Sequence, residues 1–241
     1  MQLLLLLGRA TKDMGVTEIS KLLGVQKSTV HSLLQTLMAR DFVQQNETGR
    51  YSLGVQLIEL GHICLEKLDI RDVARPSMLE LANETSQIAI LAVLAHDKLI
   101  IIEKVEPERP FLIIPKFDFS VAVHSTAVGK VLMANASSEI IDKIIDNGLE
   151  KYTDFTLTDR TELLKELDVI RKQGYGIGCN ETINGVTCLA APIFNNSRKV
   201  IAALSVSCPS SVLSENEHTE IIQILKQKAG IISQRLGCRQ L

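Results

Sequence analysis

The chain has 241 residues, of which 46% are hydrophobic and 22% are charged, and its formal net charge is −2 at pH 7. This composition excludes an intrinsically disordered chain and leaves room for one large domain or two smaller ones with buried cores. No stretch reaches the roughly 18 apolar residues that a membrane-spanning helix needs, so we expect no membrane partner. The five cysteines form no Cys-x-x-Cys pair, which favours free thiols and a cytoplasmic protein.

Charge is divided unevenly along the chain. Residues 1–54 hold six Lys or Arg residues against four Asp or Glu, whereas the remainder holds 20 against 24. A slightly basic head on an acidic body is the direction expected of a protein that binds nucleic acid. The field of one head is weak until heads are paired.

Residues 2–9 predict a short apolar helix, which would support a helix-turn-helix in the residues that follow. The first helix of that motif is expected to have Thr17 as its N-cap and to end at Gly24. Val25 would then pack in the corner before the second helix. The apolar stripe of the first helix consists of Ile19, Leu22 and Leu23.

A second helix is expected to begin at Ser28 or Thr29. Its apolar residues recur at intervals of three and four and should point inward together. They are Val30, Leu33, Leu34 and Leu37. The opposite face is small and polar, so it can enter a DNA major groove and exchange hydrogen bonds with base edges.

A small β-wing follows the second helix. Residues 43–45 and 50–53 alternate as strands do, and residues 46–49 supply a turn. Together these elements predict a winged helix-turn-helix domain over residues 1–54. Its expected contacts to double-stranded operator DNA are Lys27, Ser28, Thr29, His31, Ser32, Gln35, Thr48 and Arg50.

Residues 55–69 predict a helix within a linker that extends to residue 70. Several of its apolar residues are spaced near heptad intervals, namely Leu57, Leu60, Cys64 and Leu68. Such a helix buries its stripe either against its own body or against the same helix of another subunit.

Residues 71–241 alternate helices and hairpins. Helices are expected over residues 73–85, with Pro76 in the first turn, and over 126–133, 137–147, 159–173 and 214–237. Capping boxes are expected at Asp159 with Glu162 and at Ser214 with Glu217. Strands are expected over residues 88–94, 99–105, 111–115, 119–123, 175–179, 187–194 and 200–207. This order predicts an α+β fold, an antiparallel sheet with helices on its faces.

Several segments resemble the IclR family of bacterial transcriptional regulators. Residues 27–34 and the wing that ends at Gly54 resemble the family's N-terminal domain, and residues 124–130 resemble its HATALGK-like segment. Residues 174–176, 185–194 and 202–207 resemble its C-terminal blocks. The resemblance implies that residues 71–241 form a GAF-like effector-binding domain. It also implies that the linker helix pairs DNA-binding heads in a homodimer or homotetramer.

The resemblance further implies where a small-molecule effector binds. The helix that starts at Ala127 and Val128 would offer backbone N–H groups to an anion, which a helix N-terminus favours. Cys188, Ser205 and Ser207 match other pocket residues of the family, and serines two apart on one strand face the same side. The alternatives that remain open are core packing for Cys188 and a solvated strand face for the two serines.

Two positions depart from the residues that the family often carries. Gly178 stands where relatives often have an acid, which argues against a hydroxyl- or amine-rich effector held in the same way. Ser32 stands where they often have Arg, which should weaken backbone anchoring or shift the DNA sequence read.

Other site chemistries find little support. Lys130 after Gly129 lacks the earlier glycine and the following Ser or Thr of a P-loop. Cys188 and His124 suggest a thiol–imidazole pair, but no third orienting residue is evident. The histidines and cysteines show no metal-ligand spacing. We therefore expect no catalytic residue, no metal and no cofactor.

These features predict a DNA-binding transcriptional regulator. We expect a repressor whose effector, an organic or aromatic acid, alters operator binding. One alternative stays open, namely a small-molecule sensor or thiol-dependent enzyme whose N-terminal domain mediates only protein contacts.

Overall fold

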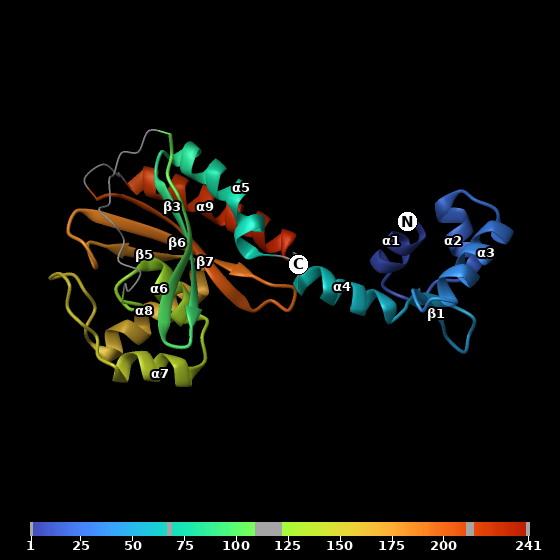
Figure 1. The fold of residues 1–241 in the computed structure, drawn as a ribbon, viewed down its shortest axis with the longest axis horizontal. Helices are drawn as coiled ribbons and strands as arrows, with labels where there is room; N and C mark the ends of the chain where they lie inside the picture. The colour runs from blue at the N-terminus through green and yellow to red at the C-terminus, as the bar shows by residue number, and fades with distance from the viewer. Residues whose placement is uncertain (1, 67–68, 109–121, 211–214, 240–241) are drawn as a thin grey trace. The chain divides into compact units, whose positions relative to one another are not determined.

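The structure is a computed structural model that describes residues 2–66, 69–108, 122–210 and 215–239 (Figure 1). It divides into two compact units, Met1–Leu68 and Asp69–Leu241, and each is described by itself.

The first unit is a small helical domain with a two-stranded wing. Its elements are α1 (Gln2–Arg9), α2 (Val16–Leu23), α3 (Lys27–Met38), β1 (Val43–Gln45), β2 (Tyr51–Leu53) and α4 (Gln56–Glu66). The wing strands are antiparallel. The first three helices and both strands share one core, which contains Leu3, Leu7, Ile19, Val30, Leu34, Val43 and Tyr51. The predicted winged helix-turn-helix is therefore present.

Helix α2 begins earlier than the sequence suggests. Its first residue is Val16 and its N-cap is Gly15, so the predicted cap at Thr17 is wrong. The reason is that the Glu18 carboxylate accepts a hydrogen bond from the Gly15 N–H at 2.8 Å, which starts the helix two residues earlier. The helix ends as predicted at Gly24, whose φ of 67° is the left-handed conformation that glycine favours.

Helix α3 also begins earlier than expected, and fewer apolar residues of α2 and α3 are buried than the sequence predicts. Its first residue is Lys27 with Gln26 as N-cap, rather than Ser28 or Thr29. Leu22 and Leu33, which the helical pattern places inside, are exposed instead, Leu33 by 46%. Val25, which the sequence places in the corner between the two helices, is exposed as well. In a domain this small each helix contacts the core through only a narrow stripe, which on α3 is centred on Val30 and Leu34.

The two helices that follow the wing end and begin at other residues than the sequence predicts. Helix α4 ends at Glu66, and Asp69 is the N-cap of α5 (Ile70–Thr85) rather than part of the preceding helix. The Asp69 side chain accepts a hydrogen bond from the Arg71 N–H at 2.9 Å. Because this cap starts α5 three residues early, Pro76 lies inside the helix, and its predicted place in the first turn is wrong.

The second unit is built on a five-stranded sheet. The strands are β3 (Ile88–Ala95), β4 (Lys98–Val105), β5 (Gly176–Cys179), β6 (Val186–Phe194) and β7 (Val200–Pro209), in the order β4–β3–β7–β6–β5. All neighbouring pairs in this order are antiparallel. The other helices are α6 (Ala127–Ala134), α7 (Ser138–Asp146), α8 (Arg160–Gln173) and α9 (Glu215–Arg235). The predicted α+β fold is confirmed.

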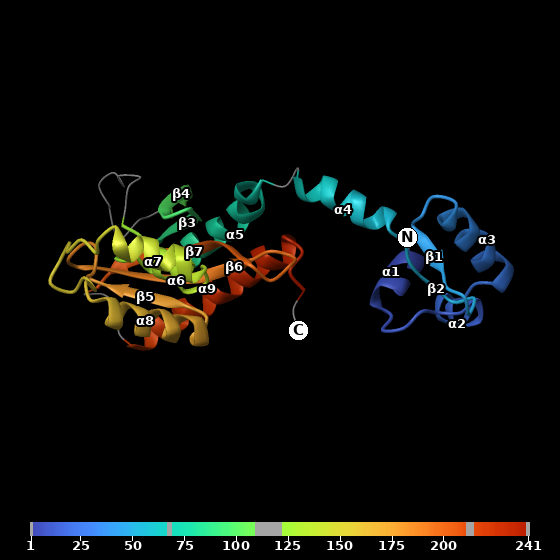
Figure 2. The same ribbon diagram turned by 90° about the horizontal axis from the view of Figure 1, so that it is seen from below.

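Helices cover both faces of this sheet (Figure 2). On one face α5 and α9 lie side by side, and Met78 and Leu225 share a core with Leu204 of β7. On the other face α6 and α8 pack, and Val131 shares a second core with Ala203 of the same strand. Alternate residues of β7 thus face different cores, as the pleat of a strand requires.

A few predicted elements lie outside the described residues. These are the strand at 111–115, most of the strand at 119–123, and the capping box of Ser214 with Glu217. Ala122 and Val123, at the end of the second of those strands, are described and are not in a strand, because the chain turns there into α6. Asp159 caps α8 by accepting hydrogen bonds from two backbone N–H groups, which is the Asp159 half of the predicted capping box.

Candidate DNA-binding and effector sites

The outward face of α3 carries most of the residues predicted to contact DNA. All six of them are exposed, namely Lys27, Ser28, Thr29, His31, Ser32 and Gln35. Val30 and Leu34 on the opposite face are buried in the core and fix how the helix is oriented in its domain. Short polar side chains on an exposed helix face are what a major groove admits.

Arg50, at the base of the wing, is held against α2. Its guanidinium donates to the Glu18 carboxylate at 2.8 Å and to the Asp13 carbonyl oxygen at 2.7 Å. The side chains of Arg50 and Glu18 remain 45% and 51% exposed. The Gly15 N–H and, to a smaller degree, Arg50 lower the pKa of Glu18. Arg50 thus braces the wing and keeps part of its guanidinium surface in solvent, a role that sequence analysis missed.

The turn of the wing is organised by Asn46. Its side-chain oxygen accepts hydrogen bonds from the backbone N–H groups of Thr48 and Arg50, and from the Thr48 hydroxyl at 2.7 Å. Gly49 has a φ of 76°, a conformation that favours glycine. The turn therefore holds Thr48, which is exposed, in a defined conformation.

The predicted effector residues of the sheet lie on the face that α6 covers. The strand register places Gly178, Cys188 and Ser207 side by side across β5, β6 and β7. Cys188 Sγ lies 3.2 Å from Ser207 Oγ. Ser205 lies on the same face one row away, and both serines are buried. The interpretation of the serines as a solvated strand face is therefore wrong.

Helix α6 begins next to this row of residues. Thr126 caps the helix by accepting a hydrogen bond from the Gly129 N–H at 3.1 Å. A Cβ atom at Gly178 would lie 3.2 Å from the Ala127 nitrogen, so strand β5 and the helix start are in close contact. The structure thus brings the predicted N-terminal site, Ala127 and Val128, next to the predicted pocket residues of the sheet.

Cys188 and His124, which sequence analysis considered as a catalytic pair, have other partners. Burial raises the pKa of the Cys188 thiol, and the hydrogen bond with Ser207 lowers it to a smaller degree. His124 Nε2 lies 3.0 Å from the Glu150 carbonyl oxygen, and its ring lies near that of Tyr152. Burial lowers the pKa of His124. Cys188 is half-buried, and a thiol with a raised pKa is a poor nucleophile.

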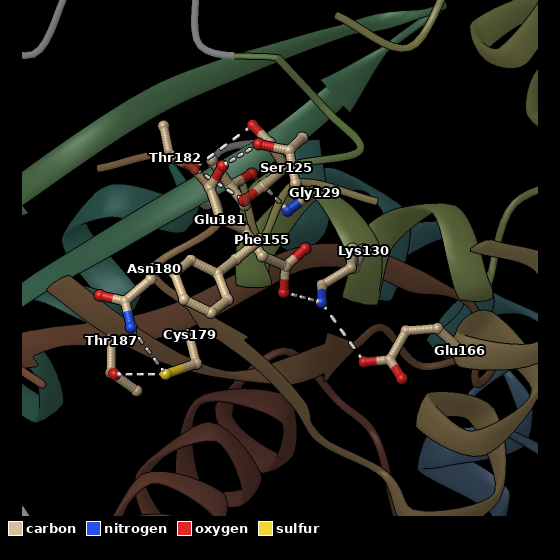
Figure 3. Close-up of polar contacts among 12 residues, drawn as sticks. Ser125, Gly129, Lys130, Phe155, Glu166, Cys179, Asn180, Glu181, Thr182 and Thr187 are labelled. Carbon is tan, nitrogen blue, oxygen red and sulfur yellow. Dashed lines mark hydrogen bonds and ion pairs between the residues drawn. The ribbon is translucent and has the colours of Figure 1, made fainter. Parts of the chain in front are cut away.

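A buried lysine forms a charged cluster that sequence analysis did not identify (Figure 3). Lys130 of α6 is 1% exposed, and its Nζ lies 2.6 Å from Glu181 Oε1 and 3.3 Å from Glu166 Oε1. Burial raises the pKa of Glu181, while Lys130 and, to a smaller degree, the Cys179 backbone N–H lower it. A lysine in an otherwise apolar helix is a signal for a buried counterion, but sequence does not say which carboxylate supplies it.

Within the described ranges, no helix is long and apolar enough to cross a membrane. The same residues contain no group of three or more His, Cys, Asp or Glu side chains arranged to hold a metal ion.

Known proteins match both units of the chain. The family model of the bacterial transcriptional regulator IclR C-terminal domain matches residues 62–234, and that of the IclR helix-turn-helix domain matches residues 1–47. The chain is 35% identical to the HTH-type transcriptional regulator XynR of Escherichia coli, over 98% of this chain and 95% of XynR. It is 29% identical to the HTH-type transcriptional repressor AllR of Escherichia coli, over 93% of this chain and 83% of AllR.

A solved structure agrees with these matches. The crystal structure of the Thermotoga maritima IclR is similar with a TM-score of 0.66 and 28% identity, over 98% of this chain and 96% of that one. The chain therefore belongs to the IclR family of bacterial transcriptional regulators, which join a helix-turn-helix DNA-binding domain to a C-terminal effector-binding domain.

Proposed function

We propose that this regulator is a cytoplasmic repressor that binds a palindromic operator as a homodimer or homotetramer. In this proposal residues 1–54 bind DNA, residues 55–70 link and pair the heads, and residues 71–241 bind a small organic or aromatic acid. Its likeness to the repressor AllR supports the sign of regulation. The observation that carries the proposal is that α6 begins beside Cys188, Ser205 and Ser207 of the sheet. The same chain also has an exposed polar face on α3.

DNA contact is assigned to two surfaces. The six exposed residues of α3 would read base edges, because their side chains are short and project away from the core. Thr48 and Arg50 of the wing would contact the phosphate backbone, where a cation positions the protein without reading sequence. The bracing of Arg50 by Glu18 reduces the positive charge available there.

Effector binding is assigned to Ala127, Val128, Cys188, Ser205 and Ser207. The first-turn N–H groups of α6 have no partners within the helix, so they suit a carboxylate. The two serine hydroxyls and the thiol then supply polar contacts in an otherwise apolar site, as small-molecule pockets commonly do. We propose no enzymatic step and no cofactor, because the Cys188 thiol is half-buried and desolvation raises its pKa.

Pairing is assigned to α4. Several of its large apolar side chains are exposed, namely Ile58, Leu60 and Ile63, and Val55 before it is exposed as well. A helix with this surface is stabilised by packing on the same helix of a second copy. The effector would then change operator affinity by binding two arrangements of the assembly unequally.

The first test is fluorescence anisotropy on the DNA just upstream of this protein's own gene, with a scrambled fragment as control, across a salt series. Tight, salt-dependent binding with a clear preference over the scramble is expected. Equal binding to both fragments would place the operator elsewhere, and no binding to either would refute the DNA-binding assignment.

The pocket assignment has its own test. Ser205→Ala should weaken the response to an acid that releases the operator, and it should leave operator binding without effector unchanged. A ligand titration in which this variant binds the acid as tightly as the natural chain would refute the pocket. A thiol-dependent enzyme would instead be favoured if Ser205→Ala bound the acid fully and also turned over a substrate that only Cys188→Ala failed to turn over.

A further inference from the structure

The charged cluster around Lys130 has an unused acceptor. Glu181 is only 8% exposed, and its Oε1 pairs with Lys130 at 2.6 Å. Its other oxygen, Oε2, is buried with no hydrogen-bond partner of ordinary geometry among the described residues. With Glu166 as the second carboxylate on Lys130, the cluster has one more negative charge than positive charge. A buried acceptor without a donor is costly, so it indicates that a donor arrives from elsewhere.

This cluster adjoins the proposed effector pocket. Lys130 lies one turn after Ala127, at which α6 begins. Glu181 follows strand β5, whose Gly178 pairs with Cys188 of β6 and lies against the Ala127 nitrogen. Figure 3 shows the Glu181 carboxylate beside Lys130, with Ser125 and Gly129 close by at the start of the helix.

The segment that carries Glu181 is held in place on both sides. Its neighbour Thr182 donates a hydrogen bond to the Ser125 carbonyl oxygen at 2.7 Å, just before the cap of α6. The Glu181 carbonyl oxygen accepts from the Thr156 hydroxyl at 2.6 Å. The carboxylate therefore has a fixed position relative to the helix start, which a residue that determines specificity requires.

We propose that Glu181 determines effector specificity by accepting a hydrogen bond on Oε2 from a hydroxyl group of the effector. The effector class is then a hydroxycarboxylic acid with one negative charge, whose carboxylate binds the start of α6. This rests on the proposed function of the second unit as an acid-binding domain.

Two physical effects give the selectivity. A hydroxyl donor satisfies the buried oxygen, whereas an analogue without it leaves that oxygen unpaired. A second carboxylate in place of the hydroxyl is repelled, because the cluster already has excess negative charge. Glu181 thus supplies a carboxylate acceptor three residues after Gly178.

The test uses three probes of the same carbon skeleton length, namely propionate, lactate and malonate. Propionate carries no further group, lactate has a hydroxyl on the second carbon, and malonate has a second carboxylate as its third carbon. Isothermal titration calorimetry of the full chain should show that lactate binds tightest, by on the order of tenfold over propionate, and that malonate binds weakest. Lactate binding no tighter than propionate binding, including no binding of either, overturns the proposal.

The variant Glu181→Gln tests the residue itself. It keeps an oxygen acceptor for Lys130 but removes the charge, so the preference for lactate should fall severalfold and malonate should gain affinity. Glu166→Gln is the matched control, because it removes the other carboxylate of the same lysine and should leave the ratio of lactate to propionate unchanged. An unchanged ratio in Glu181→Gln, or an equal change in Glu166→Gln, contradicts the assignment.

Folding and pocket location are controlled separately. If Glu181→Gln does not fold by circular dichroism, Glu181→Asp keeps the charge but shortens its reach, and it should reduce the lactate preference. Ser205→Ala reports on the pocket. If Ser205→Ala binds lactate normally while Glu181→Gln does not, the pocket assignment fails and the role of Glu181 stands. If Glu181→Gln binds lactate normally while Ser205→Ala does not, the pocket assignment stands and the role of Glu181 fails.

Discussion

Each unit of this regulator contains an ion pair between a basic residue and a glutamate distant in sequence, and the two pairs differ in their surroundings. Arg50 and Glu18 in the DNA-binding unit are 2.8 Å apart with both side chains about half exposed. Lys130 and Glu181 in the effector unit are 2.6 Å apart and almost completely buried. An exposed pair contributes little to stability because water screens it. Breaking a buried pair costs about 3–5 kcal/mol because one charge is left without a partner. Burial therefore decides what each pair does.

The largest expected effect comes from breaking the buried pair. Lys130→Met should lower the free energy of unfolding by about 3 kcal/mol, because Glu181 is left buried without its cation. Urea denaturation of the full chain measures this loss. The loss should shrink on acidification, because Lys130 lowers the pKa of Glu181 in the natural chain, so its removal raises that pKa further and the folded variant binds a proton more readily than the folded natural chain.

A second substitution checks that the unpaired charge of Glu181, and not the loss of the lysine side chain, causes the loss of stability. Lys130→Met with Glu181→Leu removes both charges and should recover most of the lost stability. If the double variant is as unstable as the single one, the comparison between buried and exposed pairs does not explain the effector unit.

Packing beside the buried pair should give the next largest effect. A Cβ atom at Gly129 would lie 1.9 Å from the Val123 carbonyl oxygen, so Gly129→Ala should cost about 2 kcal/mol or more and displace the start of α6. Gly230 on α9 is the matched control, since nothing lies within 4 Å of its added Cβ. Gly230→Ala should stabilise the protein by about 0.5–1 kcal/mol in the same urea assay. Similar losses in the two variants would contradict the structure at α6.

An intermediate effect is expected on the exposed face of α3. Gln35→Ala should reduce discrimination between the operator and single-base variants by about 1–3 kcal/mol, because a base-edge contact is lost. Its stability should hardly change, since Gln35 is exposed. Competition anisotropy measures the discrimination, with Gln45→Ala on the wing as the control. Unchanged discrimination would mean that another face of the helix reads the DNA.

The smallest effect is expected at the exposed pair. Glu18→Gln can still accept the Gly15 hydrogen bond, so stability should hardly change. Loss of the negative charge beside Arg50 should strengthen binding to all DNA sequences alike. Arg50→Ala should weaken binding to all sequences and lower the salt slope by about 1. A change in sequence preference in either variant would contradict a backbone role for Arg50.

Much of the DNA-binding unit could be predicted because its functional residues are exposed and local in sequence. The polar face of α3 follows from helical periodicity alone, and Gly24 marks the turn. The errors arose where one side chain changed a helix start. Glu18 moved the cap of α2 to Gly15, and Asp69 moved the start of α5, because hydrogen bonds to backbone N–H groups outweigh weak positional preferences.

The sequence by itself determined the α+β class, the winged helix-turn-helix and the family, because periodicity, turn residues and motif order are local properties. Only the tertiary structure decided that Gly178, Cys188 and Ser207 form one row, since strand register joins distant segments. It alone decided that Glu181 and Glu166, both distant in sequence, are the carboxylates that pair with Lys130. A buried charge requires a counterion, but which counterion reaches it depends on how the chain folds back on itself.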